Sequence, residues 1–487
     1  MKLSTLLKSF TSVSPEYVDT EITGLQNDSR QIAPGDLFIA YPGAATDGRQ
    51  YIDRAIQAGA TAVLYEPQDS SLSSGSFGNT PLIALPKLSE QLAEIACAFY
   101  DNPARKLSIT GVTGTNGKTT IAYQLAQAYS LLGKQAAYVG TLGQGSVHSL
   151  NVLPNTTPDA LCLQRLFSQY VKEGIQQVCM EVSSHALSLG RVGCIDFNQA
   201  IYTNLSLDHL DFHQTMHDYA LAKASLFARK SLQYAIINQD DDYSQLMLQH
   251  LPKNCRPLLY GLTNAADIQA THWESNLAGS VLDVKSPWGT HRLHLQSLGR
   301  FNIYNSLSVF ASLMASEVAS IEDVIGLMSQ LKPSPGRMEI VAQNPCVIVD
   351  YAHTPDALEN VLLTLVDLKP QTLWVVFGCG GDRDRSKRPL MGRIASQLAD
   401  KVILTNDNPR SEDPDKILQD ILKGMPDSHL IKAIPDRREA IHYALSHAGE
   451  QNVVLIAGKG HEDYQIIGSQ RFAFSDQKVV RELLQQV

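Results

Sequence analysis

The stretch from Lys106 to Gly133 constrains this chain most, because it predicts a strand, a glycine-rich turn and a helix in direct succession. The turn, Gly114-Thr-Asn-Gly-Lys-Thr-Thr120, has two glycines that let backbone N–H groups face an anion at the positive end of the helix. Lys118 adds a cation, and the hydroxyl of Thr119 is placed to bind Mg²⁺. The pattern favours a nucleotide-binding phosphate loop.

The spacing of this turn departs from the strict Walker form, since the position five residues before Gly117 is Val112 and not a glycine. An alternative is a glycine-rich connection between strand and helix that binds nothing. That alternative accounts for the glycines, but it gives no reason for a lysine followed by two threonines. Nucleotide binding is therefore the better interpretation.

Length and charge limit the classes of protein to which the chain can belong. Its 487 residues, 44% of them hydrophobic, are enough for about three globular domains. The net charge of −9 argues against a nucleic-acid-binding surface. Neither a signal peptide nor an apolar run long enough to span a membrane is present. Seven cysteines without a CxxC pair indicate reduced thiols in a cytoplasmic protein.

The first region, residues 1–87, predicts a small α/β domain. Its polar segment 27–38 lies between predicted strands, where such a domain places ligand-binding groups. An ordinary loop would have a similar composition, and these residues alone do not decide between the two. The predicted strands are 37–40, 61–66 and 81–86, and the predicted helix is 46–59.

The middle region, residues 88–334, has polar groups after several predicted strands. The segment 155–159, Asn-Thr-Thr-Pro-Asp, precedes a helix and would bind an anion. A strand delivers Glu181 and then Ser183-Ser184-His185 at its carboxyl end, the edge at which parallel sheets bind ligands. Two histidines and two aspartates within 206–213 favour a metal or phosphate site, and a structural hydrogen-bonding role for these histidines is the alternative.

Lys223 lies in a predicted helix, 216–230, on the same apolar stripe as Tyr219 and Phe227. A lysine in that position must extend its ammonium group to solvent, pair with an acid or change its chemistry. When these residues are considered alone, extension to solvent is the ordinary interpretation.

The last region follows Lys332-Pro-Ser-Pro-Gly-Arg337, where two prolines and a glycine predict a linker. Four strands then alternate with helical stretches, which predicts a doubly wound parallel sheet. A polar cluster follows each strand, which argues for one composite site, and the glycines at 378–381 do not match the GxGxxG dinucleotide motif. The predicted strands are 347–350, 373–378, 401–405 and 453–458, and the predicted domains are 1–87, 88–334 and 335–487.

Eleven short motifs, in order along almost the whole chain, resemble those of the Mur ligase family. One such motif would be a weak signal, but eleven in order are very specific. The resemblance implies an α/β fold with an N-terminal UDP-binding domain, a central P-loop-type ATPase domain and a C-terminal Rossmann-like parallel-sheet domain. The motifs are TGTNGKTT (113–120), NTTPD (155–159), MEVSSHAL (180–187), TNLSLDHLDFH (203–213), YALAKASLF (219–227), FNIYN (301–305), PGRME (335–339), VDYAHTP (349–355), GCGGDRDRSKRPLMG (378–392), DNPR (407–410) and GKGHE (458–462).

Within the family, the motifs are most similar to those of members that add meso-2,6-diaminopimelate to UDP-MurNAc-L-Ala-D-Glu in peptidoglycan synthesis. The resemblance implies that ATP phosphorylates a carboxylate and that an amine then attacks the acyl phosphate, with catalysis mainly by positioning and charge neutralisation. The implied ligands are ATP, Mg²⁺, the UDP-sugar dipeptide and diaminopimelate. A monomer without nucleic-acid or membrane partners is expected.

By resemblance, residues from two domains would bind ATP. Asn305 would contact the adenine, Asp350 the ribose and Arg337 the γ-phosphate, while His353 would lie near the phosphoryl transfer. The phosphate loop and its helix would hold the β- and γ-phosphates. The implied ATP-binding residues are Gly114, Thr115, Asn116, Gly117, Lys118, Thr119, Thr120, Asn305, Arg337 and Asp350.

The resemblance also implies a magnesium site and a modified lysine. Thr119, Glu181 and His209 would bind Mg²⁺. Lys223 matches a family lysine that carries a carbamate, formed from a neutral amine and CO₂. This modification turns a cation into a long anionic metal ligand and gives a reason for a lysine on an apolar helix face.

Contacts to the UDP-sugar dipeptide carry over to six positions. The chain departs from the family at Leu189, where a glutamine is frequent, and at Ala44-Ala45, where some relatives have more polar residues. The six implied positions are Ser29, Asn155, Thr156, Thr157, Ser183 and Arg191.

The amino acid that is added depends on the DNPR motif, because Arg410 can bind the distal carboxylate that distinguishes diaminopimelate from lysine. Family members that add lysine lack this arginine. Arg388 would bind a carboxylate and Glu462 an ammonium group. The implied diaminopimelate-binding residues are Arg388, Asp407, Asn408, Pro409, Arg410, Gly458 and Glu462.

Two other functions compete with this interpretation. A ligase of the folylpolyglutamate synthase type would share the phosphate loop, but it would lack the N-terminal domain and the DNPR motif. A P-loop binding or switch protein would need no amino acid, and it would give no reason for polar clusters in three domains.

Overall fold

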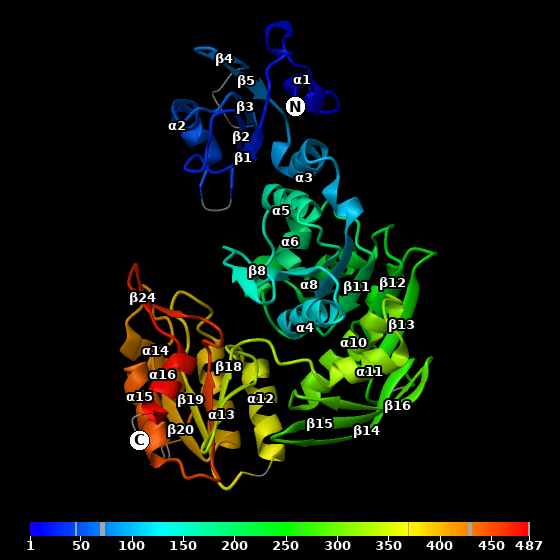
Figure 1. Ribbon diagram of the computed structural model, residues 1–487. Helices are drawn as coiled ribbons and strands as arrows, with labels where there is room; N and C mark the ends of the chain where they lie inside the picture. The colour runs from blue at the N-terminus through cyan, green and yellow to red at the C-terminus, as the bar shows by residue number, and fades with distance from the viewer. Residues whose placement is uncertain (44–45, 69–73, 264, 369, 427–430, 486–487) are drawn as a thin grey trace.

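The computed structural model has three α/β parts that follow one another along the chain, each built on its own sheet (Figure 1). We call them the N-terminal, central and third modules. The predicted three-domain α/β fold is confirmed, whereas the domain limits at 87/88 and 334/335 stay predictions. The described residues are 1–43, 46–68, 74–263, 265–368, 370–426 and 431–485.

The N-terminal sheet has five strands in the order β1-β2-β3-β5-β4, and only β4 is antiparallel to its neighbour. Strands β2 and β3 are buried along their whole length, because helix α2 covers one face and helices α1 and α3 cover the other. The elements are α1 Leu3–Leu7, β1 Gly24–Gln26, β2 Asp36–Ala40, α2 Ile52–Gln57, β3 Ala62–Tyr65, β4 Gly75–Phe77, β5 Thr80–Ala84 and α3 Leu88–Phe99.

The central sheet has eleven strands in the order β16-β15-β14-β13-β12-β11-β6-β10-β7-β8-β9. Its strands from β14 to β7 are parallel, and an antiparallel meander extends each edge. Strand β6, which leads into the phosphate loop, lies well inside the sheet. The strands are β6 Ser108–Thr113, β7 Ala136–Gly140, β8 Gly143–Ser146, β9 Ser149–Asn151, β10 Gln177–Glu181, β11 Gln199–Tyr202, β12 Tyr234–Asn238, β13 Arg256–Gly261, β14 Ile268–Asn276, β15 Gly279–Ser286 and β16 Gly289–Leu295.

Two apolar layers cover the faces of the central sheet. Leu125 and Leu307 belong to one layer, through α4 and α10, and Phe167 and Phe227 belong to the other, through α5 and α8. The apolar residues that the sequence places at helical spacing therefore form both cores. The helices are α4 Lys118–Leu131, α5 Ala160–Lys172, α6 Ser184–Ser188, α7 Leu210–His213, α8 Met216–Phe227, α9 Ser244–Gln249, α10 Arg300–Ala315 and α11 Ile321–Met328.

The third module has the predicted doubly wound sheet, in the order β17-β18-β22-β19-β20-β21, parallel except for the edge strand β17. A separate hairpin, β23–β24, follows it. The elements are β17 Glu339–Gln343, β18 Cys346–Asp350, α12 Pro355–Asp367, β19 Leu373–Phe377, α13 Lys387–Leu398, β20 Lys401–Leu404, α14 Pro414–Leu422, β21 Ile431–Ala433, α15 Arg437–His447, β22 Val453–Ala457, β23 Tyr464–Ile467, β24 Gln470–Ala473 and α16 Asp476–Leu484.

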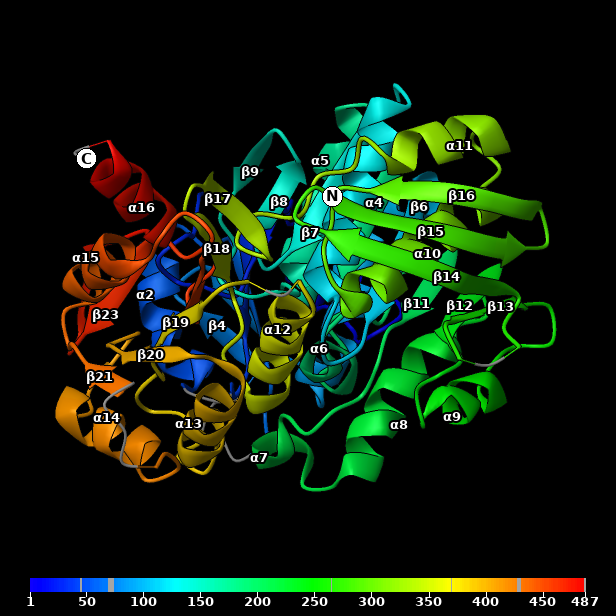
Figure 2. The same cartoon turned by 90° about the horizontal axis from the view of Figure 1, so that it is seen from below.

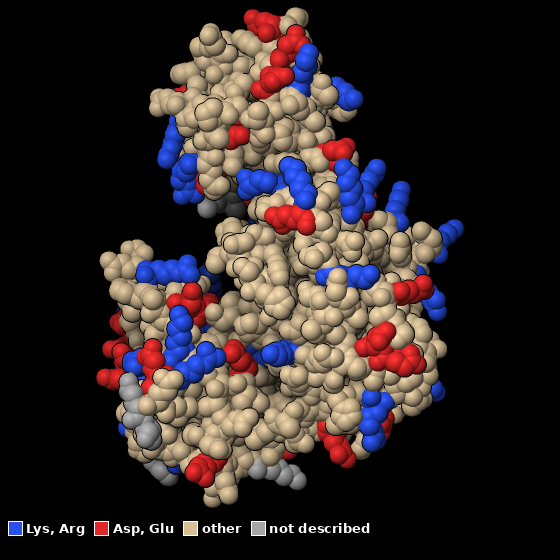
Figure 3. Space-filling model, in the orientation of Figure 1, with Lys and Arg blue, Asp and Glu red and all other residues tan. Residues whose placement is uncertain are grey.

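The third module packs beside the central module, and helix α12 lies between their sheets in both ribbon views (Figures 1 and 2). On the same face, Figure 3 shows an open notch between the N-terminal module at the top and the third module at the lower left. All seven cysteines are free. Within the described residues, every helix is too short or too polar to cross a membrane.

Candidate active site

The phosphate loop between β6 and α4 has two glycines in the left-handed region, Gly114 with φ +151° and Gly117 with φ +88°. A Cβ atom on Gly114 would lie 1.8 Å from the hydroxyl oxygen of Thr203, and one on Gly117 would lie 2.5 Å from the side-chain oxygen of Asn305. Side chains would therefore clash at both positions, which explains why glycine is needed there.

Two lysine ammonium groups lie on one carbonyl oxygen of this loop. Lys118 Nζ donates to the carbonyl oxygens of Gly114 and Thr115, both at 2.8 Å. Lys223 Nζ, from α8, donates to the same Gly114 oxygen at 2.8 Å. Neither lysine forms an ion pair with a residue that the structure describes. The loop therefore presents two lysines without an acidic partner in the described part of the chain, a place that a polyanion could fill.

Lys223 is 1% exposed, and its Nζ lies 4.3 Å from the centre of the Tyr219 ring. The interpretation that its side chain extends to solvent is therefore wrong. Burial, and then the charge of Lys118, hold the pKa of Lys223 well below its usual range. A lowered pKa increases the fraction of neutral amine, which is the form that reacts with CO₂.

Glu181, at the end of β10, is buried and accepts four hydrogen bonds, one of them from the hydroxyl of Thr141 at 3.2 Å. The other three donors are the hydroxyl of Tyr138 (2.5 Å), the backbone N–H of Thr141 (2.8 Å) and the hydroxyl of Thr119 (3.0 Å). A carboxylate and a hydroxyl oxygen are ligands that Mg²⁺ prefers, and the ion commonly takes its other ligands from phosphate and water. The pair formed by Glu181 and Thr119 therefore fits a magnesium ion.

His209, the third predicted metal ligand, lines the same cavity as Glu181. Burial lowers the pKa of His209 to about 4, so its imidazole is neutral at pH 7. Among the described residues, no three His, Cys, Asp or Glu side chains converge as a metal site. The magnesium role of His209 therefore stays a prediction.

A cavity of about 790 Å³ connects the phosphate loop to the predicted dipeptide residues of the central module and to the predicted ATP-binding residues of the third module. It brings together residues that the sequence separates by more than 200 positions. Gly114, Ser29 and the predicted diaminopimelate-binding residues are not part of its lining. The predicted residues that line it are Thr115, Asn116, Gly117, Lys118, Thr119, Thr120, Asn155, Thr156, Thr157, Glu181, Ser183, Arg191, His209, Lys223, Asn305, Arg337, Asp350 and His353.

The third module contributes to this cavity through Arg337 and Asp350. The Arg337 guanidinium lies 4.4 Å from the centre of the Tyr351 ring, and its Nη2 donates to the hydroxyl oxygen of Thr119 at 3.5 Å. Asp350 accepts two backbone N–H groups at 2.7 Å, and burial raises the pKa of its carboxyl group. Arg337 thus already reaches the start of α4.

Asp356 is a cavity residue that sequence reasoning missed. Its Oδ2 accepts hydrogen bonds from Asn116 Nδ2 at 2.8 Å and from Ser206 Oγ at 3.2 Å. This contact ties α12 of the third module to the phosphate loop. In the sequence, Asp356 looks like an ordinary acidic residue in the first turn of a helix, and no local signal separates the two roles.

Three of the predicted dipeptide residues on the central module, Thr157, Ser183 and Arg191, are joined by hydrogen bonds. Arg191 Nη1 donates to the Thr157 carbonyl at 2.9 Å, and the Thr157 hydroxyl donates to the carbonyl of Glu181 at 2.8 Å. The hydroxyl of Ser183 caps α6 by accepting the N–H of Ala186 at 3.2 Å. The set is therefore fixed in place beside the magnesium pair.

The predicted dipeptide contact in the N-terminal module lies apart from these residues. Ser29 is buried in the N-terminal module, outside the cavity lining. Leu189, where the chain departs from the family, is 52% exposed, so an apolar side chain there is not part of a core. Ala44-Ala45, the other departure, lies outside the described residues.

The DNPR and GKGHE motifs meet at one end of the third sheet. Asn408 Nδ2 donates to Glu462 Oε2 at 2.9 Å. A Cβ atom on Gly458, which has φ +113°, would lie 2.5 Å from Asp407 Oδ2. We call Asp407, Asn408, Arg410, Gly458, Lys459 and Glu462 the third-module cluster.

Arg388 and Arg410 bind neighbouring carbonyl groups of the glycine run after β19. Arg388 Nη2 donates to the Gly380 oxygen at 3.3 Å, and Arg410 Nη1 donates to the Gly381 oxygen at 2.7 Å. Arg388 is fully buried, and its guanidinium also pairs with Glu412 at 2.9 Å and with Asp420 at 3.1 Å. The Arg388 guanidinium is thus already paired with two acids of the protein. Its role as a ligand of a substrate carboxylate stays a prediction.

The linker and the GKGHE motif are in close contact. Gly336 has φ +67°, and a Cβ atom on it would lie 2.1 Å from the backbone nitrogen of His461. The Tyr351 ring, which stacks on Arg337, also lies 5.2 Å from the His461 ring. These contacts join the cavity to the third-module cluster.

Three family models match the chain. The Mur ligase family catalytic domain matches residues 21–100, the Mur ligase middle domain 112–313, and the Mur ligase glutamate ligase domain 336–460.

Full-length relatives and solved structures agree with these matches. The chain is 43% identical over 95% of its length, and 94% of the relative's, to a UDP-N-acetylmuramoyl-L-alanyl-D-glutamate--2,6-diaminopimelate ligase of Chromobacterium violaceum. A solved structure described by the same enzyme name covers the whole chain and 99% of its own, at 36% identity and a TM-score of 0.72. MurF of Acinetobacter baumannii shares the fold over 99% of this chain and 98% of its own, at 18% identity and a TM-score of 0.70. From its full-length relatives and its matched domains, the chain belongs to the Mur ligase family.

Proposed function

We propose that this protein is an ATP-dependent ligase that joins an amine of meso-2,6-diaminopimelate to a carboxylate of UDP-MurNAc-L-Ala-D-Glu in peptidoglycan precursor synthesis. The main support is the set of full-length relatives, which are named as diaminopimelate ligases. The cavity and the third-module cluster support it as candidate sites for the substrates.

In the first step, a carboxylate oxygen of the dipeptide attacks the γ-phosphorus of ATP, and ADP leaves with the electrons of the broken P–O bond. The phosphate loop and Lys118 hold the phosphates, and Arg337 neutralises charge that moves onto the transferred group. Asn305 and Asp350 hold the nucleoside, and His353 lies near the transfer. Mg²⁺ held by Glu181 and Thr119, together with His209 and a carbamate on Lys223, would neutralise phosphate charge when bound.

In the second step, the amine attacks the carbonyl carbon of the acyl phosphate, inorganic phosphate leaves, and the nitrogen loses a proton. Arg410 binds the distal carboxylate of diaminopimelate, and Glu462 binds an ammonium group. The dipeptide lies along Thr157, Ser183 and Arg191, and its UDP group reaches Ser29. The protein acts as a cytoplasmic monomer with domains at 1–87, 88–334 and 335–487.

Phosphate release, measured with each substrate omitted in turn, tests this proposal. We expect release only when ATP, the dipeptide and diaminopimelate are all present, and we expect diaminopimelate to be used far better than lysine. Release from ATP alone at the same rate would indicate a switch or simple ATPase. Equal use of lysine would refute the assignment of the amino acid.

A further inference from the structure

Lys459 is a fully buried lysine that none of the predicted roles uses. Its Nζ donates to Glu462 Oε2 at 2.9 Å and to Asn408 Oδ1 at 3.2 Å, and it lies 3.8 Å from Asp407 Oδ1. All three partners belong to the predicted amino-acid site. A buried lysine is unfavourable unless it is paired, so these contacts need a structural or functional reason.

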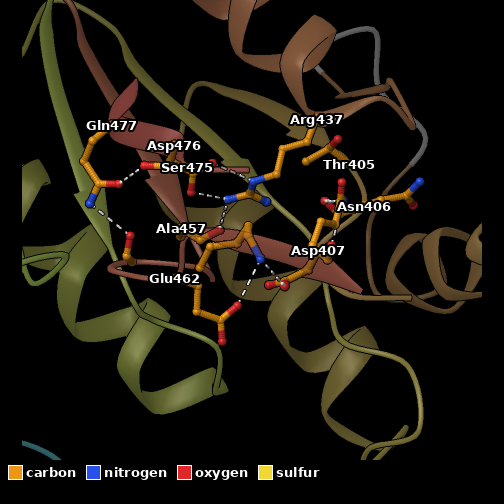
Figure 4. Close-up of polar contacts among 12 residues, drawn as sticks. Thr405, Asn406, Asp407, Arg437, Ala457, Glu462, Ser475, Asp476 and Gln477 are labelled. Carbon is orange, nitrogen blue, oxygen red and sulfur yellow. Dashed lines mark hydrogen bonds and ion pairs between the residues drawn. The ribbon is translucent and has the colours of Figure 1, made fainter. Parts of the chain in front are cut away.

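The charges behind this lysine are already balanced. Arg437 and Asp476, both fully buried, form a two-bonded ion pair with N–O distances of 2.8 Å, and Arg437 also donates to the Ala457 carbonyl at 3.0 Å (Figure 4). Lys459 is therefore the cation in contact with the carboxylates of Asp407 and Glu462. Two carboxylates and one ammonium group leave this part of the site with one negative charge.

The same lysine fixes the geometry of the site. Asn408 Oδ1 accepts both Lys459 Nζ and the N–H of Ile466 (2.9 Å), which leaves its amide group to donate to Glu462 Oε2. Glu462 Oε2 thus receives two donors, whereas Oε1 has no hydrogen-bond partner within the described part of the chain. The Glu462 side chain is 14% exposed, so a ligand can reach it.

We propose that Lys459 is a positioning residue for the incoming amino acid, which holds Glu462 Oε2 so that Oε1 binds the substrate ammonium group that does not react. Lys459 also lowers the negative charge of the Asp407–Glu462 pair to one, which a single ammonium group neutralises. This inference rests on the proposed function. It explains how the enzyme would prefer an amino acid with a second amine over one that has only the reacting amine.

The test compares diaminopimelate with 2-aminopimelate, a diacid that has only the reacting amine. In the unmutated protein, KM for diaminopimelate should be lower by at least about 10-fold, because a charged hydrogen bond contributes about 1.5–3 kcal/mol. Lys459→Met should raise KM for diaminopimelate by about 10-fold and KM for 2-aminopimelate by less than about threefold, with KM for ATP unchanged. Lys478→Met, at an exposed lysine of α16, is the control and should leave both values unchanged.

A merely structural role would move both KM values together, so the ratio of the two values decides. A folded Lys459→Met protein that keeps the ratio within threefold of the unmutated one would overturn the inference. If circular dichroism shows that this variant does not fold, Glu462→Gln replaces it, and an unchanged ratio in that variant overturns the inference equally. If the unmutated protein does not use diaminopimelate at all, it is the proposed function that fails.

Discussion

In the central cavity, Lys118 and Lys223 share one carbonyl oxygen and have no acidic ion-pair partner among the described residues. In the third-module cluster, Lys459 lies between Glu462 and Asp407. The lysines at the phosphate loop lack such a partner there, which suits a polyphosphate, whereas the charges of the third-module cluster are nearly balanced, which suits a zwitterion. The lysines of the two regions therefore differ in their electrostatic role. The fold gives Lys459 two acidic ion-pair partners, whereas the described residues give Lys118 and Lys223 none.

The largest effect should come from removing positive charge at the phosphate loop. We expect Lys118→Ala to lower kcat/KM for ATP by about 1000-fold, because a preorganised donor at a reacting phosphate contributes on that scale. Phosphate release with all substrates present measures it. Lys134→Ala, at an exposed lysine just after the same helix, is the matched control. A loss below about 10-fold would mean that the loop does not act through this charge.

Replacement of Lys223 should show whether this residue acts as an ammonium group or as a carbamate. We expect Lys223→Ala to lower kcat by about 100-fold or more, and short carboxylates such as acetate to restore part of the activity by replacing the missing anionic ligand. Lys230→Ala, at an exposed lysine, should behave like the unmutated protein. No rescue, or near-normal activity before rescue, would count against the carbamate.

A substitution in the third-module cluster should change KM for the amino acid and not KM for the nucleotide. We expect Arg410→Ala to raise KM for diaminopimelate by about 10- to 100-fold, the loss of one charged hydrogen-bonded pair, with KM for ATP nearly unchanged. Steady-state kinetics with each substrate varied measure both values. Arg393→Ala, at an exposed arginine of α13, is the control. A similar rise in KM for ATP would show that the two regions are not separate.

The smallest effect should come from the contact between the regions. Asp356→Ala removes the carboxylate that accepts from Asn116 and Ser206, so we expect kcat to fall by about two- to tenfold, the scale of a hydrogen bond between modules. Binding of diaminopimelate, measured by calorimetry, should not change. Glu359→Ala, at an exposed acid of the same helix, should have no effect on either measurement. An unchanged kcat in Asp356→Ala would mean that this contact between the modules does not contribute to catalysis.

The sequence was sufficient where a function depends on neighbouring residues. The phosphate loop, the strand that delivers Glu181 and the four predicted strands of the six-stranded third sheet are local patterns, and the structure has them within one or two residues of the predicted bounds. The cavity was predictable only through the resemblance, since periodicity alone does not place Arg337 against Thr119.

The residues that were missed act through tertiary pairing. Lys459 lies between two glycines in a short loop, and nothing in those letters shows that its partners are Asn408 and Glu462. Lys223 illustrates the same limit. Its position on an apolar stripe of the helix predicted extension to solvent, but other parts of the fold bury the side chain. Side-chain partners across modules are set by packing, and one sequence carries no direct signal for them.

The close approach of Gly336 to His461 has a mechanical consequence. Because the backbone at 336 leaves no room beside the GKGHE segment, we expect a pivot of the third module to lie earlier, among residues 332–335, and Arg337 to move as one body with the segment that holds Lys459 and Glu462. Arg337, the proposed γ-phosphate ligand, and Glu462, the proposed ligand of the substrate ammonium group, would then move together. A rotation of the third module that brings Arg337 to the γ-phosphate would also bring the bound amino acid to the acyl phosphate. Activation of the acid and arrival of its nucleophile would then coincide.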